Sequence, residues 1–414
     1  MKNILSILLL LVVISCNKNV SPVANTSENT TNSEPMTEGE SIQQSLIESN
    51  NQFTLELFNN VSSANENIII SPFSVSSALA MTYAGAKNNT QSQMSYVLHF
   101  NHNQEVLHAD FSQLLSNIKA LNSDENEVNI ANSLWVQNKL KLKESYLKTV
   151  KTNYASDVQS VDFILESEKT RGTINKWVES KTNQKIKDLI PVGGITKSTM
   201  LVLTNAIYFL GTWENKFDVK NTIESIFYLN EESKVNAPFM RQTTKFKYFE
   251  DEFVQVIDLP YAKNKLSMMI VMPKEKFGLM KITKAMLNDN YTHILAGLQL
   301  QKVAVSLPKF KISSNFDLGA KLSEMGMPDA FTSAADFSGI TGSKDLNISK
   351  IMHKAFIEVN EKGTEAAGAT TVVMEKTSYV KTPVFTADSP FLYLIKDNIS
   401  GSILFIGKIV NPVQ

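Results

Sequence analysis

The sequence has few of the residues on which catalytic, metal-binding and nucleic-acid-binding sites depend. Of its 414 residues only Cys16 is a cysteine, so no intramolecular disulfide can form. Arginine occurs twice, at Arg171 and Arg241, and the formal net charge is -1. A chain with this charge lacks a basic field for a phosphate backbone, which argues against nucleic acid as a partner.

Motifs of enzymes are missing as well. The chain has no GxxxxGK[ST] or GxGxxG loop, no GxSxG elbow and no HExxH motif. No His/Cys pair has the spacing of zinc ligands. The histidines are His99, His102, His108, His293 and His353. The first three are close in sequence but are more typical of helix or loop positions, so we expect no enzyme activity, no metal and no cofactor.

The first sixteen residues predict export. A lysine precedes an apolar run, residues 4–14, that is too short to span a bilayer but typical of a secretory signal. Residues 13–16, Val-Ile-Ser-Cys, resemble a bacterial lipobox, which implies loss of residues 1–15 and a lipid on Cys16. We expect a lipoprotein held on a bacterial membrane, at the cell surface or in the periplasm, and extracellular if released. An ordinary cleaved signal with an unmodified Cys16 is the alternative.

The remainder divides into a tether and one domain. Residues 16–45 are rich in Asn, Ser, Thr and Glu, which predicts a flexible tether. Residues 46–414 carry no internal repeat, and 43% of the whole chain is hydrophobic, enough for a large core. A mixed α/β domain is indicated by helical and strand-like stretches, including helices at 104–121 and 168–184 and strands at 201–209, 225–230 and 301–312.

One segment, residues 361–378, has the position of a loop and the composition of a strand. Its first half is nearly all small residues without proline, whereas exposed loops are usually rich in Pro, Asn, Asp and Ser. Residues 370–373 are β-branched, as in strands. Such a segment should be able to become a strand.

Several separated motifs resemble the serpin family over nearly all of residues 46–414. They are NIIISPFS at 67–74, LTNAIYF and GTW within 203–213, EKGTEAAGA at 361–369 and FTADSPFLY at 385–393. The resemblance implies an α+β fold with three β-sheets, eight or nine helices and an exposed reactive-centre loop, about residues 361–383. It also implies suicide inhibition, in which a protease cleaves the loop, forms an acyl-enzyme and is trapped when the loop inserts into the main sheet.

The motif EKGTEAAGA at 361–369 matches the hinge of inhibitory serpins. The hinge residues are Glu361, Gly363, Thr364, Glu365, Ala366, Ala367, Gly368 and Ala369. In the register that the family pattern implies, the inward side chains of the inserted strand are Thr364, Ala366, Gly368, Thr370, Val372 and Met374. Both Glu365 and Glu375 then face out. Insertion therefore buries no unpaired charge.

The family pattern also predicts the cleaved bond. Counting from Gly363 leads to Thr377 as the P1 residue and Ser378 as P1′. Thr377 would suit elastase-like or subtilisin-like proteases. A register one residue shorter makes Lys376 the P1 residue and trypsin-like enzymes the targets, and Met374 or Tyr379 are further options.

The resemblance assigns further roles. A polar cluster beneath the main sheet, the shutter, falls on Ser71, Ser74, Asn205 and His353, and Trp213 falls at the breach where the loop first enters. Mutual hydrogen bonds would satisfy Asn205 within its apolar run. Residues 104–121 offer only Lys119 as a base, so heparin is not expected as a cofactor.

We therefore expect a monomeric inhibitor of serine proteases, with cysteine proteases as a further target class. A non-inhibitory serpin that carries a ligand or acts as a chaperone is the alternative.

Overall fold

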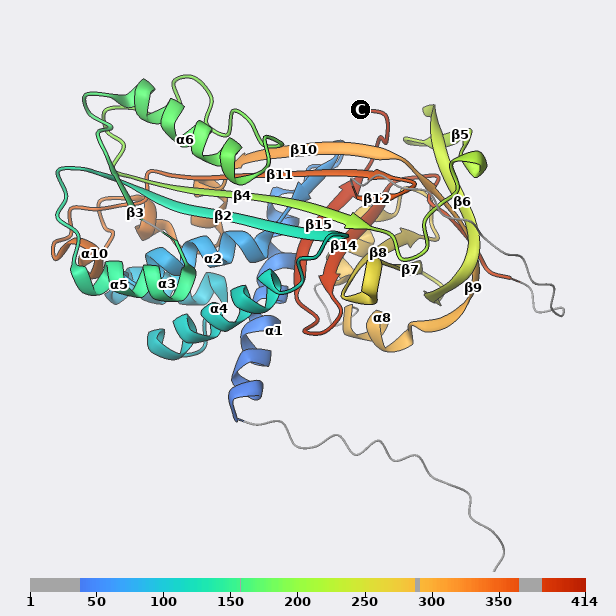
Figure 1. Ribbon diagram of the computed structural model, residues 1–414, viewed down its shortest axis with the longest axis horizontal. Helices are drawn as coiled ribbons and strands as arrows, with labels where there is room; N and C mark the ends of the chain where they lie inside the picture. Colours follow the sequence, from blue (N-terminus) through green and yellow to red (C-terminus); the bar gives the residue numbers. More distant parts are fainter. Residues whose placement is uncertain (1–37, 157, 287–290, 365–381) are drawn as a thin grey trace, which may run out of the picture. The chain divides into compact units, whose positions relative to one another are not determined.

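The computed structural model describes residues 38–156, 158–286, 291–364 and 382–414, which belong to a single compact unit beginning at Glu38 (Figure 1). The α-helices of these residues are α1 Glu38–Val61, α2 Pro72–Tyr83, α3 Asn88–Leu98, α4 Gln104–Lys119, α5 Glu144–Tyr154, α6 Ser167–Lys181, α7 Leu279–Ala285, α8 Tyr291–Gly297, α9 Gly319–Met325 and α10 Ser338–Thr341. The predicted mixed α/β class is confirmed, with ten α-helices in the described part where eight or nine were expected.

A six-stranded sheet has the order β10-β11-β12-β4-β2-β3. Its strands are β10 Phe310–Asp317, β11 Lys350–Asn360, β12 Gly363–Thr364, β4 Leu201–Thr212, β2 Asn126–Gln137 and β3 Val158–Val161. α6 covers one face, and α2 and the helices beside it lie on the other (Figure 1). Along β4, Val202 and Ala206 pack with the α6 side while Leu203 and Ile207 join the main core, which explains the unbroken apolar run.

A nine-stranded sheet has the order β1-β15-β14-β8-β7-β6-β9-β13, with β5 also paired to β6. Its strands are β1 Ile68–Ile70, β15 Ile403–Ile409, β14 Phe391–Asp397, β8 Leu266–Pro273, β7 Val254–Pro260, β6 Lys234–Glu250, β9 Gln299–Pro308, β13 Val384–Thr386 and β5 Ile223–Tyr228.

The three β-sheets that the resemblance implies are joined by hydrogen bonds into two in the described residues. β6 is long enough to pair with β9 through residues 239–248 and with β7 through residues 247–250. The two groups of strands that would be a second and a third sheet are therefore continuous through β6.

Two predicted boundaries also differ. α1 begins at Glu38, so residues 38–45 belong to the first helix rather than to the tether. Leu46 and Ile47 are buried and give this helix a packed face from its third turn onward. The single strand expected at 301–312 is two strands, β9 and β10, because the chain passes from one sheet to the other after Pro308.

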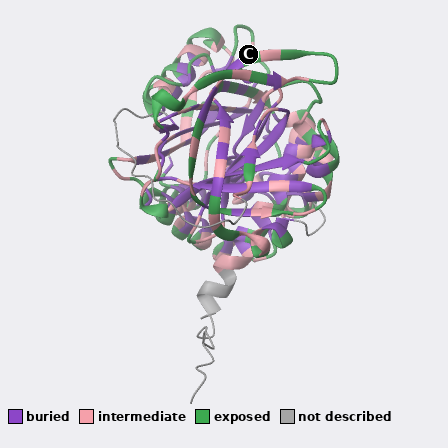
Figure 2. Cartoon of the chain, turned by 90° about the vertical axis from the view of Figure 1, so that its right-hand side faces the viewer, coloured by how far each residue is buried: buried purple, intermediate pink, exposed green. Residues whose placement is uncertain are grey.

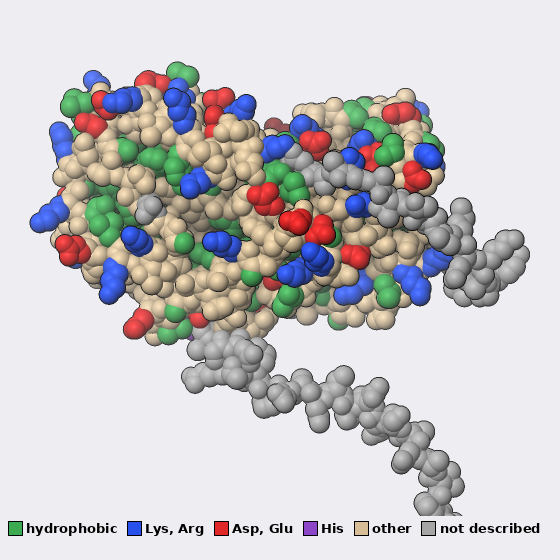
Figure 3. Space-filling view, viewed as in Figure 1, with side chains coloured by type: hydrophobic (Ala, Val, Ile, Leu, Met, Phe, Trp, Pro, Cys, Tyr) green, Lys and Arg blue, Asp and Glu red, His purple; other side chains and the backbone are tan. Residues whose placement is uncertain are grey.

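The buried residues form the interior of this unit (Figure 2). On the face drawn in Figure 3, acidic and basic side chains are interspersed. In the described ranges no helix combines the length and the apolar character needed to cross a bilayer.

Candidate functional site

The hinge enters the six-stranded sheet between β11 and β4. After β11 the chain turns at residues 361–362 and runs back as β12, antiparallel to both neighbours. Thr364 lies between Val359 of β11 and Gly211 of β4. Below this point β11 and β4 pair directly in parallel, from Phe356 opposite Tyr208 onward. β12 thus runs toward the seam at which these two strands pair directly.

Position 363, the first residue of β12, requires a glycine. Its φ is +147°, a conformation that other residues rarely adopt. A Cβ built there would lie 2.0 Å from the carbonyl oxygen of Gly211. The missing side chain therefore allows the hinge backbone to approach β4.

Thr364 is fully buried beneath an aromatic pair. Its hydroxyl is hydrogen-bonded to the Tyr261 hydroxyl at 2.8 Å. Tyr261 in turn stacks on Trp213, with 4.5 Å between ring centroids and 9° between ring planes. Burial raises the pKa of Tyr261, so its hydroxyl stays protonated and available for this bond.

Trp213 also holds the turn that precedes the hinge. Its indole Nε1–H donates to the Asn360 carbonyl at 3.0 Å, and its backbone N–H donates to the Lys362 carbonyl at 2.9 Å. The structure therefore places Trp213 at the point where the loop enters the sheet.

Glu361 anchors the same turn. It is 6% exposed, and its carboxylate accepts from the Thr222 hydroxyl at 2.9 Å and pairs with Lys309 at 3.1 Å. Burial acts to raise the pKa of Glu361, but the backbone N–H, Thr222 and Lys309 together hold that pKa below its usual value. The carboxylate thus stays charged and bound.

The polar cluster expected beneath the sheet is assembled from four separate segments. The backbone N–H of Ser71 donates to His353 Nε2 at 3.1 Å, and the Ser71 hydroxyl donates to the Leu404 carbonyl at 2.6 Å. Asn205 Nδ2 donates to the Ser74 hydroxyl, and Asn205 Oδ1 is bonded to His353 Nδ1. All four predicted residues are buried and joined in one network.

These bonds fix the state of His353. Because Nε2 accepts from the Ser71 N–H, the proton is on Nδ1, which donates to Asn205. Burial lowers the pKa of His353 to about 3. His353 is therefore neutral at physiological pH and lies directly opposite Asn205 across the β4–β11 ladder.

Sequence reasoning missed three contributors. Asn132, opposite Asn205 on β2, accepts from Asn205 Nδ2 and donates to the Ser77 hydroxyl at 3.2 Å. Tyr261 is the third. Asn132 interrupts an alternating strand and Ser77 follows Ser74 by one helical turn, so both carried a usable signal. Tyr261 is adjacent to Thr364 only in the folded chain.

The other predicted site residues lie outside the described ranges. These are Cys16, Glu365, Ala366, Ala367, Gly368, Ala369, Lys376, Thr377 and Ser378. The clustered histidines do not form one site, since His99 pairs with Glu56 at 2.8 Å and His108 bonds Tyr154 at 2.7 Å.

Comparison with known proteins agrees with this architecture. A family model described as serpin (serine protease inhibitor) matches residues 48–412. Human leukocyte elastase inhibitor is 40% identical over 384 residues, covering 89% of this chain and 99% of that protein. An uncharacterized serpin-like protein of Methanosarcina acetivorans is 40% identical over 369 residues, covering 89% of this chain and 86% of that protein. The structure of human thyroxine-binding globulin is 32% identical with a TM-score of 0.78, covering 91% of this chain and 98% of that one. The chain therefore belongs to the serpin family.

Proposed function

We propose that the protein inhibits serine proteases as a suicide substrate. The protease cleaves a bond in the loop that follows β12 and forms an acyl-enzyme with the N-terminal part of that loop. The protease is trapped as this part of the loop continues from β12 into the seam between β11 and β4. The observation that carries the proposal is the position of β12, which begins the inserted strand in the uncleaved chain. Protease inhibition, rather than an enzyme activity, also fits the family.

Insertion along this path needs no slip of the neighbouring strands. The residues that flank Thr364 are Val359 and Gly211, and the directly paired residues below include His353 and Asn205. The difference in number is the same in both pairs, since 359 − 211 = 148 and 353 − 205 = 148. β11 and β4 must therefore move apart but keep their register.

The composition of the loop matches its neighbours row by row in this register. Ala366 would lie between Ile357 and Phe209, and Gly368 between Ala355 and Ile207. The neighbours at these inward positions are buried, so small loop residues fit between them. The hydroxyl of Thr370 would fall between His353 and Asn205, the polar row on the inward face of the seam.

Closed and inserted sheets differ by many hydrogen bonds. Seven residue pairs join β11 to β4 directly, from Lys350–Val202 to Phe356–Tyr208. An inserted strand of about ten residues replaces this ladder with two antiparallel ladders, a net gain of roughly 10 kcal/mol at about 1 kcal/mol per hydrogen bond. That difference would drive the displacement of the protease.

The target class follows from the cleaved bond. Cleavage between Thr377 and Ser378 would select elastase-like or subtilisin-like enzymes, and the 40% identity to a protein named leukocyte elastase inhibitor supports this choice. Cleavage after Lys376 would select trypsin-like enzymes. Mass spectrometry of the C-terminal fragment released by each protease distinguishes the two.

The decisive experiment is incubation of the chain with an elastase, a subtilisin and a trypsin, followed by denaturing electrophoresis. A complex that survives SDS supports inhibition. Clean cleavage without any complex refutes it and favours a non-inhibitory serpin, such as a ligand carrier.

We also propose that Cys16 is lipidated and that the inhibitor acts as a monomer from a bacterial membrane. Metabolic labelling with a fatty acid should mark the wild-type chain and not Cys16→Ala. Labelling that persists in the variant would refute the anchor, and a dimer in light scattering would refute the monomer.

A further inference from the structure

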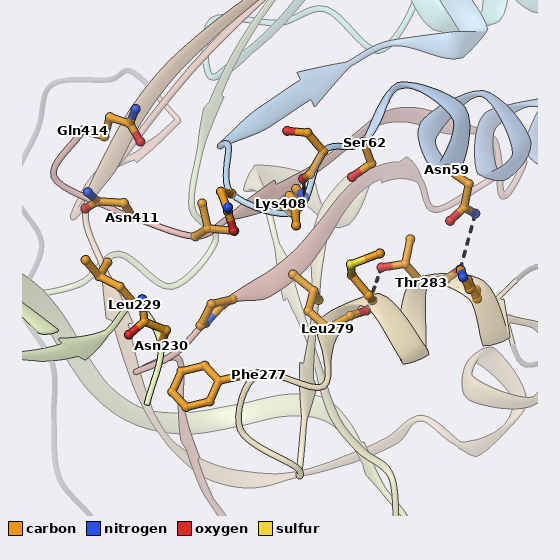
Figure 4. A pocket seen from close by; sticks show the side chains of 17 residues that line it. Asn59, Ser62, Leu229, Asn230, Phe277, Leu279, Thr283, Lys408, Asn411 and Gln414 are labelled. Atoms are coloured by element: carbon orange, nitrogen blue, oxygen red, sulfur yellow. Dashed lines mark hydrogen bonds between the residues drawn. The ribbon is translucent and has the colours of Figure 1, made fainter. Parts of the chain in front are cut away.

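A pocket of about 440 Å³ lies between the end of α1, the segment that leads into α7, and the end of β15 (Figure 4). None of its lining residues belongs to the hinge or to the polar cluster. Those used below are Leu229, Asn230, Phe277, Met280, Lys284, Lys408 and Asn411.

Lys408 is an unusual group for a pocket wall. It lies within β15 between Ile68 and Leu392 and is only 3% exposed. Its ammonium donates to the Ser63 carbonyl, yet an ammonium has three donors. Among the described residues it forms no ion pair, and burial lowers its pKa although the charge of Glu66 opposes that shift. A buried cation with unused donors is costly unless an anion accompanies it.

The other lining side chains add one positive charge and no negative one. Lys284 is a second lysine there, and the lining contains no Asp or Glu side chain. The carbonyl oxygen of the Asn230 side chain accepts from Glu232 and Ser233, and that of Asn411 accepts from Val413. The NH₂ groups of these two amides have no partner among the described residues. The pocket therefore offers donors and positive charge.

Apolar side chains line the pocket as well. Met280 is 55% exposed, and Leu229 and Phe277 lie on the same side of the view as Asn230 (Figure 4). Phe277 has a φ of +70°, which a bulky residue adopts only at a cost of about 1–3 kcal/mol. An aromatic ring held in this strained backbone conformation at the rim gives an apolar body something to stack on.

We propose that this pocket binds a small organic anion, with a carboxylate or sulfonate head at Lys408 and a short aromatic or aliphatic body against Phe277 and Leu229. The charged head satisfies the free donors, and the pocket volume limits the body to a drug-sized molecule. The site does not depend on protease inhibition, because it shares no residue with the hinge.

Calorimetric titration with naphthalene-1-acetate, beside its uncharged analogue 2-(1-naphthyl)ethanol, tests the proposal. The acid should bind the wild-type chain at least tenfold more tightly than the alcohol. Lys408→Met should lose that preference, whereas Lys281→Met, on the same helix as Lys284 but outside the lining, should retain it. Equal binding of acid and alcohol, no binding of either, or an unchanged preference in Lys408→Met overturns the proposal.

A second variant covers the case in which Lys408→Met does not fold. Phe277→Ala changes only the rim and should weaken binding of naphthalene-1-acetate at least threefold. Unchanged affinity in Phe277→Ala would place the bound anion elsewhere and overturn the proposal.

Discussion

Replacing Thr364 with arginine should turn the inhibitor into a substrate. Thr364 is fully buried, and among the described residues only the Tyr261 hydroxyl bonds to its side chain. None of the described acidic groups is bound there, so an arginine would bury an unpaired charge at a cost of several kcal/mol. Leaving the sheet instead loses the hydrogen bonds of two residues and the bond to Tyr261, about 3–4 kcal/mol in all at about 1 kcal/mol per bond. The variant hinge should therefore leave the sheet while the fold persists.

The consequence is kinetic. In the proposed mechanism the acyl-enzyme partitions between loop insertion, which traps the protease, and hydrolysis, which releases it. If about 3 kcal/mol of the burial cost appears in the barrier to insertion, insertion slows by roughly 100-fold. The number of inhibitor molecules consumed per protease molecule inactivated should rise from near one to more than about ten.

A matched control is the same substitution one residue later. Glu365 faces out in the inserted strand, so Glu365→Arg exchanges one solvated charge for another and should keep the stoichiometry near one. The assay titrates residual elastase activity and follows SDS-stable complex in parallel. If Thr364→Arg still inhibits with unchanged stoichiometry, or if Glu365→Arg abolishes inhibition equally, the register is wrong.

Three further predictions follow from the same geometry. His353, with a pKa lowered to about 3, binds a proton more readily in the unfolded chain, so stability is present above about pH 6.5 and is lost as pH falls. Between pH 7 and pH 5 this residue should lower the free energy of unfolding, measured by urea denaturation, by about 2 kcal/mol. His353→Gln should remove only this part of the pH dependence, because His108, with a pKa lowered to about 4, contributes a similar amount. A pH dependence unaltered in His353→Gln would contradict the assignment. Gly363→Ala should expel β12, since its Cβ would lie 2.0 Å from the Gly211 carbonyl oxygen; hydrogen exchange at Thr364 should accelerate, while Gly172→Ala on α6, with nothing within 4 Å, should leave that exchange unchanged. Equal protection in both variants would mean that β12 tolerates a side chain. Cleavage of the loop should raise Tm by about 10 °C or more, since insertion adds hydrogen bonds worth roughly 10 kcal/mol; an unaltered midpoint in calorimetry would indicate a loop that does not insert.

The resemblance to serpins predicted the polar cluster, and several of its members also stand out locally in the sequence. Asn205 interrupts an apolar strand, and Ser71 precedes a proline at a helix start, where its hydroxyl accepts from the Ser74 N–H. Each of these features can be recognised in the sequence alone. Which residues meet there is a matter of register, and only the β2–β4–β11 pairing brings Asn132, Asn205 and His353 side by side.

The starting point of the inserted strand could not be predicted in the same way. The small residues from Gly363 onward have nearly one composition, so nothing along the chain marks Gly363 and Thr364 as paired with β11 and β4. That pairing depends on β11 and β4 lying apart there, whereas they pair directly from Phe356 and Tyr208 onward. The split of 301–312 was hidden for a related reason, because the alternation continues through Pro308 while the chain changes sheets.

The buried groups of the polar cluster need hydrogen-bond partners in two states of the six-stranded sheet, the closed state and the inserted state. In the closed sheet His353 Nδ1–H donates directly to Asn205 Oδ1. Insertion separates the two strands and would leave both groups unpaired, at about 1–3 kcal/mol each. In the register proposed above Thr370 enters this row, and a hydroxyl can accept from His353 and donate to Asn205 at once. A valine could do neither. The bond broken while the strands part is thus replaced once the loop is in place, so the cluster raises the barrier to insertion without lowering the stability of the inserted sheet.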